Sequence, residues 1–446
     1  MTIGMVREDL SGWGRYPLHP TQASWPGDGA ALTDTVAMAE KAVARGNGRA
    51  YGDAAIGAAH TIHTGRLDRL IDFDAMTGVL TCEAGAMLAD IIDVLLPRGW
   101  IVPVTPGTCY VTVGGMIAAD VHGKNHHVAG SFTDHVNWID LMIGDGTVRR
   151  CSRLDHADLF AATCGGMGLT GIVVRAAIRM KPVETATIRQ RTIRAPDLSS
   201  ALATFEENLS WTYSVAWIDC LARDGDLGRS VVFLGEHATV DDLPADQRAD
   251  PYRRPGRRRR GIPFDLPAAT LSSPVVRAFN RLYYAAQRPG DALIGLEPYF
   301  YPLDAIRDWN RIYGRRGFLQ YQCVLPLGAS EAGLRALLAA IAAAGTGSFL
   351  AVLKRMGAGS PGFLSFPREG YTLALDFPVA DANFALLDRL DAITADHGGR
   401  IYLAKDARAR ASFAAGYDHI DRFRAVRAAY GLSDRFVSRL SQRLEI

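Results

Sequence analysis

Residues 104–127 read VTPGTCYVTVGGMIAADVHGKNHH, and this stretch decides how the rest of the chain is interpreted. It combines a Pro-Gly turn, a Gly-Gly step and a polar end rich in histidine. Gly107, Gly114 and Gly115 lack a β-carbon, so their backbone can approach a bulky partner and turn N–H groups toward it. Taken alone, the stretch leaves two interpretations open: a cradle for a ligand, or a glycine-rich hairpin with a solvated polar tip.

A second loop favours the ligand. Residues 44–53 read ARGNGRAYGD, which is again punctuated by glycine and contains the basic Arg49. Two loops of this kind indicate one extended anionic ligand that both of them contact.

Together, the two loops resemble the flavin-binding signatures of the vanillyl-alcohol-oxidase type of FAD-linked oxidases. In that family a first loop holds the diphosphate and a VGG segment runs beside the flavin. The likeness extends over nearly the whole chain, and it is closest to the branch of the family that oxidises a polyprenyl-phosphoryl ribose. It rests on four further motifs: GSF at 130–132, GGMGLTGI at 165–172, FLQYQ at 318–322 and AKD at 404–406.

The resemblance implies an α+β fold, in which a two-part FAD-binding domain (residues 1–184 and 400–446) carries an inserted ferredoxin-like cap domain (residues 185–399). The residues support the cap independently, because the pattern from Phe318 to Leu403 alternates as strand, helix, strand, strand, helix, strand. We expect a mobile basic excursion at about 240–290, with six arginines between Arg253 and Arg260. The arginine run is either a solvated loop or a contact with an anionic membrane surface or lipid phosphate.

The letters GMGLTG at 166–171 match the GxGxxG pattern of dinucleotide-binding folds. Such a site needs a strand before the glycines and a helix after them. Here the helical ADLFAAT precedes and the strand-like IVVRAAIRM follows. The glycines therefore predict a close-packed turn near the flavin, and a Rossmann fold is not supported.

The activity that the resemblance implies is FAD-dependent oxidation of the 2′-hydroxyl of a polyprenyl-phosphoryl-β-D-ribose to a ketone. This is the first half of an epimerisation to the arabinose donor for cell-envelope glycans, and a separate NAD(P)H-dependent reductase would complete it. Phe300 and Ala374 depart from the tyrosine and cysteine of the mycobacterial pocket, so an oxidase or dehydrogenase of another sugar, alditol or aldonolactone is the alternative. A flavin-binding subunit without catalysis is a third interpretation.

Three residues are the catalytic candidates by resemblance. Lys405 is expected to accept or orient the hydroxyl proton, because a flavin supplies only the hydride acceptor. His122 and Tyr51 would lie beside the flavin. Without the family, Lys405 is equally a surface lysine paired with Asp406, and His122 is equally a structural histidine.

The resemblance also assigns binding residues. Those expected to contact FAD are Gly46, Asn47, Gly48, Arg49, Ala50, Tyr51, Gly52, Asp53, Gly107, Thr112, Val113, Gly114, Gly115, Ala119, Asp120, Val121, His122, Ile172 and Tyr402. Those expected to contact substrate are Lys124, Trp217, Gln320, Gln322, Lys354 and Lys405. Alternate residues of one strand share a face, so Gln320 and Gln322 can both face a sugar while Tyr321 packs the other way.

The mode of FAD attachment is a further expectation. Relatives in the wider family tether FAD through a histidine in the first loop, where this chain has Arg49. We therefore expect non-covalent FAD. Cys109 resembles the cysteine of a second tether in some oxidases, and a link there is left open.

Composition limits the remaining possibilities. The 446 residues exceed one ordinary core, and 48% hydrophobic residues with a net charge of +2 describe a soluble protein with no reason to bind nucleic acid. The six cysteines lack metal spacing, so we expect no metal site and reduced thiols. Charged residues 7–9 argue against a signal peptide. We expect a cytoplasmic location and leave open a peripheral contact at the inner face of the plasma membrane. The uncharged stretch 336–353 is expected to be a helix and a strand, divided at Gly345, and no membrane span.

Overall fold

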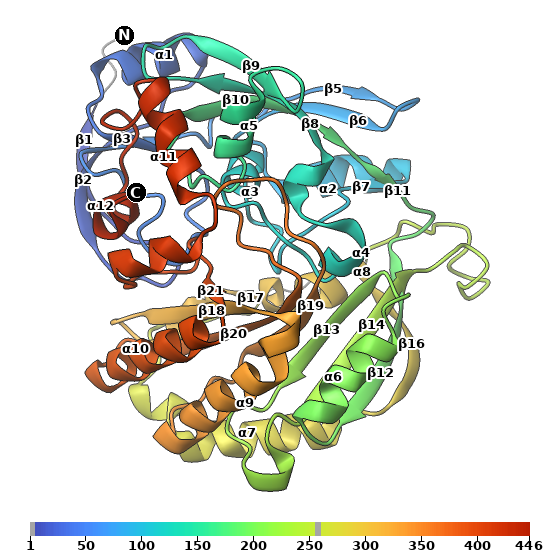
Figure 1. The fold of residues 1–446 in the computed structure, drawn as a ribbon. Coiled ribbons are helices and arrows are strands. Elements are labelled where there is room, and N and C mark those ends of the chain that lie inside the picture. Colours follow the sequence, from blue (N-terminus) through green and yellow to red (C-terminus); the bar gives the residue numbers. More distant parts are fainter. Residues whose placement is uncertain (1–4, 255–259) are drawn as a thin grey trace.

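The structure is a computed structural model that describes residues 5–254 and 260–446. Figure 1 shows two sheets from the first part of the chain above one large sheet from the middle of the chain. The first sheet has the order β1-β2-β4-β3 and is parallel between β2, β4 and β3. Its strands are β1 (Val6–Leu10), β2 (His19–Ser24), β3 (Ala42–Arg45) and β4 (His60–His63).

The second sheet is antiparallel and follows the order β5-β6-β10-β8-β9. Its strands are β5 (Leu70–Asp74), β6 (Val79–Glu83), β8 (Val136–Met142), β9 (Val148–Ser152) and β10 (Ile172–Arg179). The helices of this half are α1 (Gly29–Met38), α2 (Leu88–Leu95), α3 (Val113–Ala118), α4 (His126–Ala129) and α5 (Ala157–Thr163), with a small pair of strands, β7 (Trp100–Ile101) and β11 (Lys181–Pro182).

The large sheet contains eight strands in the order β16-β12-β14-β13-β19-β20-β18-β21. Its strands are β12 (Thr187–Ala195), β13 (Tyr213–Ile218), β14 (Ser230–His237), β16 (Gly290–Gly295), β18 (Phe318–Pro326), β19 (Ala351–Met356), β20 (Gly370–Pro378) and β21 (Arg400–Ile401). The helices that follow these strands are α6 (Leu198–Glu207), α7 (Ser273–Ala286), α8 (Leu296–Phe300), α9 (Leu327–Ala344) and α10 (Asp381–Asp396). Helices α6, α9 and α10 lie along this sheet, with α9 in contact with both others (Figure 1).

The large sheet consists of two units with the same connectivity. From β18 to β21 the elements follow the predicted order βαββαβ, and their strands lie as β19-β20-β18-β21. The strands from β12 to β16 repeat this order around α6 and α7 and lie as β16-β12-β14-β13. Both arrangements are ferredoxin-like. The two units join where β13 pairs with β19, and the sequence had suggested only the second of them.

Helix α1 begins after Asp28, which caps its first turn, and it ends at Met38, before the chain forms β3. Gly114 and Gly115 lie in helix α3, whose N-cap is Thr112. The excursion expected at about 240–290 contains the four-turn helix α7 and the short strand β15 (Arg260–Gly261), paired with β17 (Ile306–Arg307). Most of the arginine run, residues 255–259, lies outside the described residues.

The order of the elements agrees with two local predictions, the inverted order around the glycines at 166–171 and the division of the uncharged stretch 336–353. Helix α5 precedes the glycines at 166–171 and strand β10 follows them, the reverse of a dinucleotide-binding turn. The uncharged stretch 336–353 divides at Gly345, which caps α9 in the left-handed conformation. Among the described helices, α9 is the one long and apolar enough to cross a membrane by length and composition alone, but it packs on β18 and β20.

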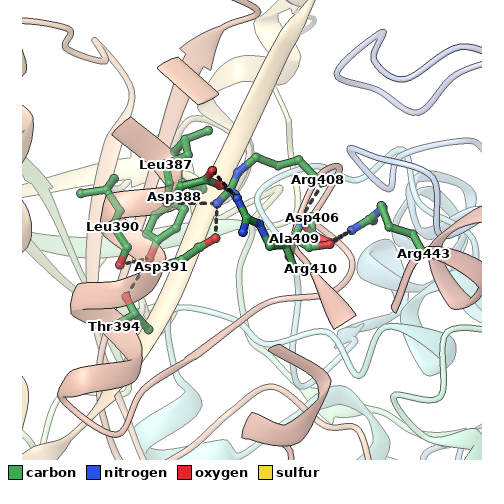
Figure 2. Close-up of polar contacts among 11 residues, drawn as sticks. Leu387, Asp388, Leu390, Asp391, Thr394, Asp406, Arg408, Ala409, Arg410 and Arg443 are labelled. Carbon is green, nitrogen blue, oxygen red and sulfur yellow. Dashed lines mark hydrogen bonds and ion pairs between the residues drawn. The ribbon is translucent and has the colours of Figure 1, made fainter. Parts of the chain in front are cut away.

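The C-terminal residues return to the first sheet. They contain α11 (Ile420–Ala429) and α12 (Arg439–Leu444), and Phe436 forms a bridge beside Ala42 of β3. Arg443 of α12 pairs with Asp53 at 2.7 Å and with Asp406 at 2.8 Å. Figure 2 shows Arg443 in contact with Asp406. The guanidinium thus connects the first glycine loop to the AKD segment.

We predict that Arg443→Met destabilises the protein. Asp53 and Asp406 are 2% and 7% exposed, and removing their partner leaves two buried carboxylates that water cannot reach. Breaking a buried ion pair typically costs about 3–5 kcal/mol, so the midpoint of urea unfolding should fall clearly. Arg424→Met is the matched control, since its pair with Asp421 is exposed and is worth less than about 1 kcal/mol. Equal midpoints for the two variants would contradict the prediction.

Candidate active site

The first glycine loop follows β3 and packs closely against two other segments. A β-carbon on Gly46 would lie 2.1 Å from the Thr112 hydroxyl oxygen, and one on Gly52 would lie 2.0 Å from the Asp406 carbonyl oxygen. Only glycine allows these approaches. None of the amide groups from Gly46 to Ala50 donates a hydrogen bond to a described residue. Consecutive amides of this kind are suited to an anionic ligand such as a diphosphate.

The second glycine segment is used differently. The amides of Val113 and Gly114 donate to carbonyls of Ala86 and Ala84 at 3.0 and 2.7 Å, so they hold α3 against a neighbouring loop. Thr112 accepts from Gly115 N–H as the helix cap. The predicted role of this segment as a cradle therefore depends on its shape, because these three amides already have acceptors.

His122 lies in the interior with one unused ring nitrogen. Its Nε2 lies 3.0 Å from Gln322 Nε2, and its ring lies 5.2 Å from the Tyr402 ring and 5.4 Å from the Phe366 ring. An amide nitrogen donates, so Nε2 accepts and the proton of the neutral ring is on Nδ1. Nδ1 is buried and has no partner among the described residues. Such a donor fits a carbonyl or hydroxyl of a bound cofactor or substrate.

Lys405 lies over an aromatic ring. Its Nζ is 3.7 Å from the centroid of the Tyr51 ring, and the two residues are tied through their backbones because Tyr51 N–H donates to Ala404 O at 3.0 Å. A cation over an aromatic face is attracted by the ring. The first loop and the AKD segment therefore meet at the predicted catalytic lysine.

Asp376 is a residue of this site that the sequence did not suggest. It lies in β20, is fully buried, and accepts from Gln320 Nε2 at 2.6 Å and from the Tyr313 hydroxyl at 3.3 Å. Burial raises the pKa of Asp376 above 3.8, while burial lowers the pKa of Lys405 below 10.5, and the charge of each group opposes the other's shift. The signal available in the sequence was a charged residue inside the otherwise apolar strand YTLALDFP.

Two further amines face the same region. Burial lowers the pKa of Lys124 to about 7 and that of Lys354 to about 8, and Lys354 also lowers the pKa of Lys124. Burial, followed by the charge of Lys354, keeps the pKa of His122 well below 6.5. Lys124 donates to Tyr299 O and lies 4.2 Å from the Tyr299 ring centroid. The cluster of Lys124, Lys354 and Lys405 suits a group with negative charge.

Several side chains of the large sheet that were predicted to contact substrate lie on one face of it. Gln322 pairs in register with Ala374, which pairs with Val352, which pairs with Trp217, so these four share one face. Tyr321 points the other way and donates to Leu390 O at 2.9 Å on α10, which confirms the predicted alternation along β18.

The segment that carries Lys405 is fixed by hydrogen bonds within its own loop and by ion pairs with α10. Asp406 accepts from the amides of Arg408 and Ala409 at 3.0 and 2.9 Å. Figure 2 shows Arg408 reaching α10, where it pairs with Asp388 at 2.8 Å and Asp391 at 2.5 Å. Burial raises the pKa of Asp391 to about 6.

Two residues predicted to contact FAD, Asp120 and Asp53, have carboxylates that are already bonded to other side chains of the protein. Asp120 is fully buried and accepts from the hydroxyls of Thr133, Ser360 and Ser365. Asp53 is paired with Arg443. These carboxylates hold the site together, and their contacts give no sign of a role toward a ligand.

The remaining predicted residues have the following positions. Arg49 lies 3.8 Å above the Trp13 ring and its Nε has no partner within the described chain, and Tyr402 donates to Ala119 O at 2.7 Å. Trp217 donates to Phe349 O at 3.0 Å, and its ring contacts Tyr283 of α7 in a tilted arrangement with centroids 4.7 Å apart. The others are Asn47, which donates to Tyr110 O; Gly48, at a φ of 61°; Gly107, whose missing β-carbon would meet no atom within 4 Å; Val121, whose carbonyl accepts from Phe132; and Ile172, at the start of β10.

Comparison with known proteins agrees with this geometry. Residues 20–152 match the family model of the FAD binding domain. The chain is 36% identical over 98% of its length to the decaprenylphosphoryl-beta-D-ribose oxidase of Mycolicibacterium smegmatis, covering 97% of that protein. It is 38% identical over 79% of its length to an uncharacterised protein of Streptomyces coelicolor, covering 98% of it, and 28% identical over 41% of its length to mouse L-gulonolactone oxidase, covering 42% of it.

The chain therefore belongs to the vanillyl-alcohol-oxidase type of FAD-linked oxidases. It is an FAD-dependent oxidoreductase with an α+β fold, as the resemblance implied. The free amides of the first loop, the orphaned His122 Nδ1 and the unpartnered Arg49 Nε are features that a bound FAD would satisfy. Within the family, its match of nearly full length is to the ribose oxidase named above.

We predict that the pH dependence of flavin reduction reports the Lys405–Asp376 pair. A neutral amine is the form that accepts a proton, so the rate with an oxidisable substrate should rise with pH as Lys405 loses its own proton. The charge of Asp376 raises the pKa of Lys405, and its removal must lower it. In Asp376→Asn the rise should therefore occur at lower pH, as measured by stopped-flow absorbance. Asp391→Asn is the control, and a profile that moves to higher pH in Asp376→Asn would contradict the assignment.

Proposed function

We propose that the protein oxidises the 2′-hydroxyl of a polyprenyl-phosphoryl-β-D-ribose to a ketone, the first half of an epimerisation to an arabinose donor. The single observation that supports this most is the buried position of Lys405 over the Tyr51 ring, where it interacts electrostatically with Asp376, Lys354 and His122. The near full-length match to a decaprenylphosphoryl-ribose oxidase supports the same substrate class.

The chemistry divides between cofactor and protein. FAD, when bound, supplies the two-electron acceptor for the hydride that leaves the carbinol carbon. The neutral amine of Lys405 accepts the hydroxyl proton as the carbonyl forms, and Tyr51 beneath it fixes its position. Burial lowers the pKa of Lys405 and so favours this neutral form, while the charge of Asp376 opposes that shift and balances the charge that the proton brings.

Binding of the substrate draws on the remaining residues. Lys124 and Lys354 are proposed to bind the phosphate, because an anion placed beside a buried amine favours its protonated form. Gln320 and Gln322 are proposed to orient the sugar, and Trp217 lies on the same face of the sheet. Asp376 holds Gln320 and His122 holds Gln322, so both amides are positioned before substrate enters. We accordingly assign residues 185–399 to a substrate-binding cap over an FAD-binding part made of 1–184 and 400–446.

The partner enzyme and the cellular location that we propose both follow from the reaction. The keto sugar requires a separate reductase that uses NAD(P)H to complete the epimerisation. We propose a cytoplasmic enzyme that acts at the inner face of the plasma membrane, because its substrate carries a polyprenyl chain.

The substrate assignment predicts which compound reduces the flavin. Under anaerobic conditions, a polyprenyl-phosphoryl ribose should bleach the flavin absorbance, while free ribose, alditols and aldonolactones should not. Because Phe300 and Ala374 depart from the tyrosine and cysteine of the mycobacterial pocket, the alternative of another sugar or alditol substrate is tested in the same screen. Reduction by the free compounds alone would replace the proposed substrate, and reduction by none would remove the catalytic assignment.

Lys405→Met tests the proposed base. Methionine keeps much of the side-chain bulk but has no proton acceptor of comparable strength, and general-base help is typically worth about a hundredfold to ten-thousandfold in rate. We expect FAD content to be unchanged and single-turnover reduction to fall at least about a hundredfold. Lys41→Met, at an exposed lysine, is the control. A change of less than about threefold in Lys405→Met would show that the lysine is not the base.

The cofactor is predicted to be held without a covalent bond, because Arg49 occupies the position of the tethering histidine. Purified protein should release intact FAD on acid denaturation, measured as flavin fluorescence in the supernatant. Cys109 donates its N–H and its thiol to Asp304, at 2.8 and 3.2 Å. Flavin that stays with the precipitated chain, and is freed in Cys109→Ala, would overturn this prediction.

A further inference from the structure

Helix α7 exposes its apolar side. Val275, Phe279 and Leu282 are 48%, 42% and 72% exposed, and Ala278, Ala285 and Ala286 on the same side are exposed as well. These positions recur at three- and four-residue intervals, which places them on one face of the helix. Soluble helices usually bury such a face, so this one has the composition of a contact surface.

The inward side of α7 is anchored by a polar contact. Asn280 is fully buried and donates to Asp219 at 2.7 Å, and Asp219 is itself paired with Arg229 at 2.7 Å. Val276 is buried beside it. The orientation of the helix is therefore fixed by these contacts, and the apolar face cannot turn inward without breaking them.

The charges around this face have one sign. Residues 273–288 contain three arginines and no acidic residue. Arg281 and Arg288 are exposed, and neither pairs with a carboxylate of any described residue. An apolar stripe bordered by unpaired arginines is the pattern of a helix that lies in the interface of an anionic bilayer.

A second observation connects this face to the active site. Aromatic rings in sequential contact, with centroids 4.3 to 6.0 Å apart, lead from α7 to the ring beneath the catalytic lysine. In order they are Phe279, Phe349, Tyr313, Phe318 and Tyr51. These rings form a continuous packed apolar layer between the exposed face of α7 and Tyr51.

We propose that the exposed face of α7, defined by Val275, Phe279 and Leu282, docks on an anionic lipid bilayer. The apolar side chains enter the acyl boundary while Arg281 and Arg288 contact the headgroups. A second copy of this chain fits the surface less well. In a two-fold pairing of α7 with itself, Arg281 lies near the middle of the helix and would face its own symmetry mate.

The docking is tested with the FAD-loaded protein and sedimented vesicles at low ionic strength. Binding should be at least about tenfold tighter to vesicles containing phosphatidylglycerol than to pure phosphatidylcholine, because each arginine contributes a factor of roughly five. Phe279→Ser/Leu282→Ser should weaken binding at least about tenfold. Met76→Ser/Leu154→Ser, at two other exposed apolar residues, is the matched control and should bind as wild type.

The charge contribution is tested separately. Arg281→Gln/Arg288→Gln should lose the preference for anionic vesicles, whereas Arg66→Gln/Arg98→Gln, with the same change in net charge at other exposed positions, should keep it. In addition, the fluorescence added by Leu282→Trp should be quenched by brominated lipid, and that added by Leu154→Trp should not.

Two results would overturn the proposal. One is vesicle binding that the α7 variants leave unchanged. The other is a concentration-dependent dimer that Phe279→Ser/Leu282→Ser converts to a monomer, which would assign the face to a second copy. The use of this surface for substrate entry rests on the proposed function, but the vesicle assays need no substrate. Failure of the docking proposal can therefore be distinguished from failure of the proposed function.

Discussion

The ion pairs of the Arg443 guanidinium with two buried carboxylates are the interaction on which the arrangement of the site depends. The guanidinium pairs with Asp53 from the first glycine loop and with Asp406 from the segment that carries Lys405. Neither carboxylate is exposed enough for water to replace the partner, so the three groups must stay together. A single side chain of the last helix therefore sets the position of the first glycine loop relative to Lys405, although 390 residues separate Arg443 from Asp53.

Burial is the second factor that sets the electrostatics of the site. His122, Lys124, Lys354 and Lys405 are all basic, and all have pKa values that desolvation lowers. A region that holds several bases with lowered pKa values can respond to an anion, because an opposite charge raises those pKa values again and favours the protonated forms. The same lysines can thus be bases toward a hydroxyl and cations toward a phosphate, depending on what lies beside each one.

The sequence predicted the parts of this protein that local patterns encode. The turn at 166–171, the division at Gly345 and the second βαββαβ order correspond to elements of the structure, because each follows from the pattern of neighbouring residues. The first βαββαβ unit was missed because the long connection between β14 and α7 hid the repeat. Asp376 was missed because the meeting of a buried carboxylate with Lys405 depends on strand pairing, which no local pattern records. Asp53 and Asp120 were assigned to the cofactor from their motifs, but their partners, Arg443 and the hydroxyls of residues 133, 360 and 365, come from distant segments.

The side-by-side arrangement of the two βαββαβ units has a consequence for how such an enzyme changes over time. Their shared boundary at β13 and β19 covers one edge strand of each unit, so neither offers that edge for pairing with another chain. The unit from β18 to β21 supplies Asp376, Lys354 and both glutamines, whereas α7 belongs to the other unit. Substitutions that adapt the outer surface to a different lipid or partner can therefore accumulate in the unit from β12 to β16. The unit from β18 to β21, which supplies the site residues, can stay unchanged meanwhile, although both units belong to one continuous sheet.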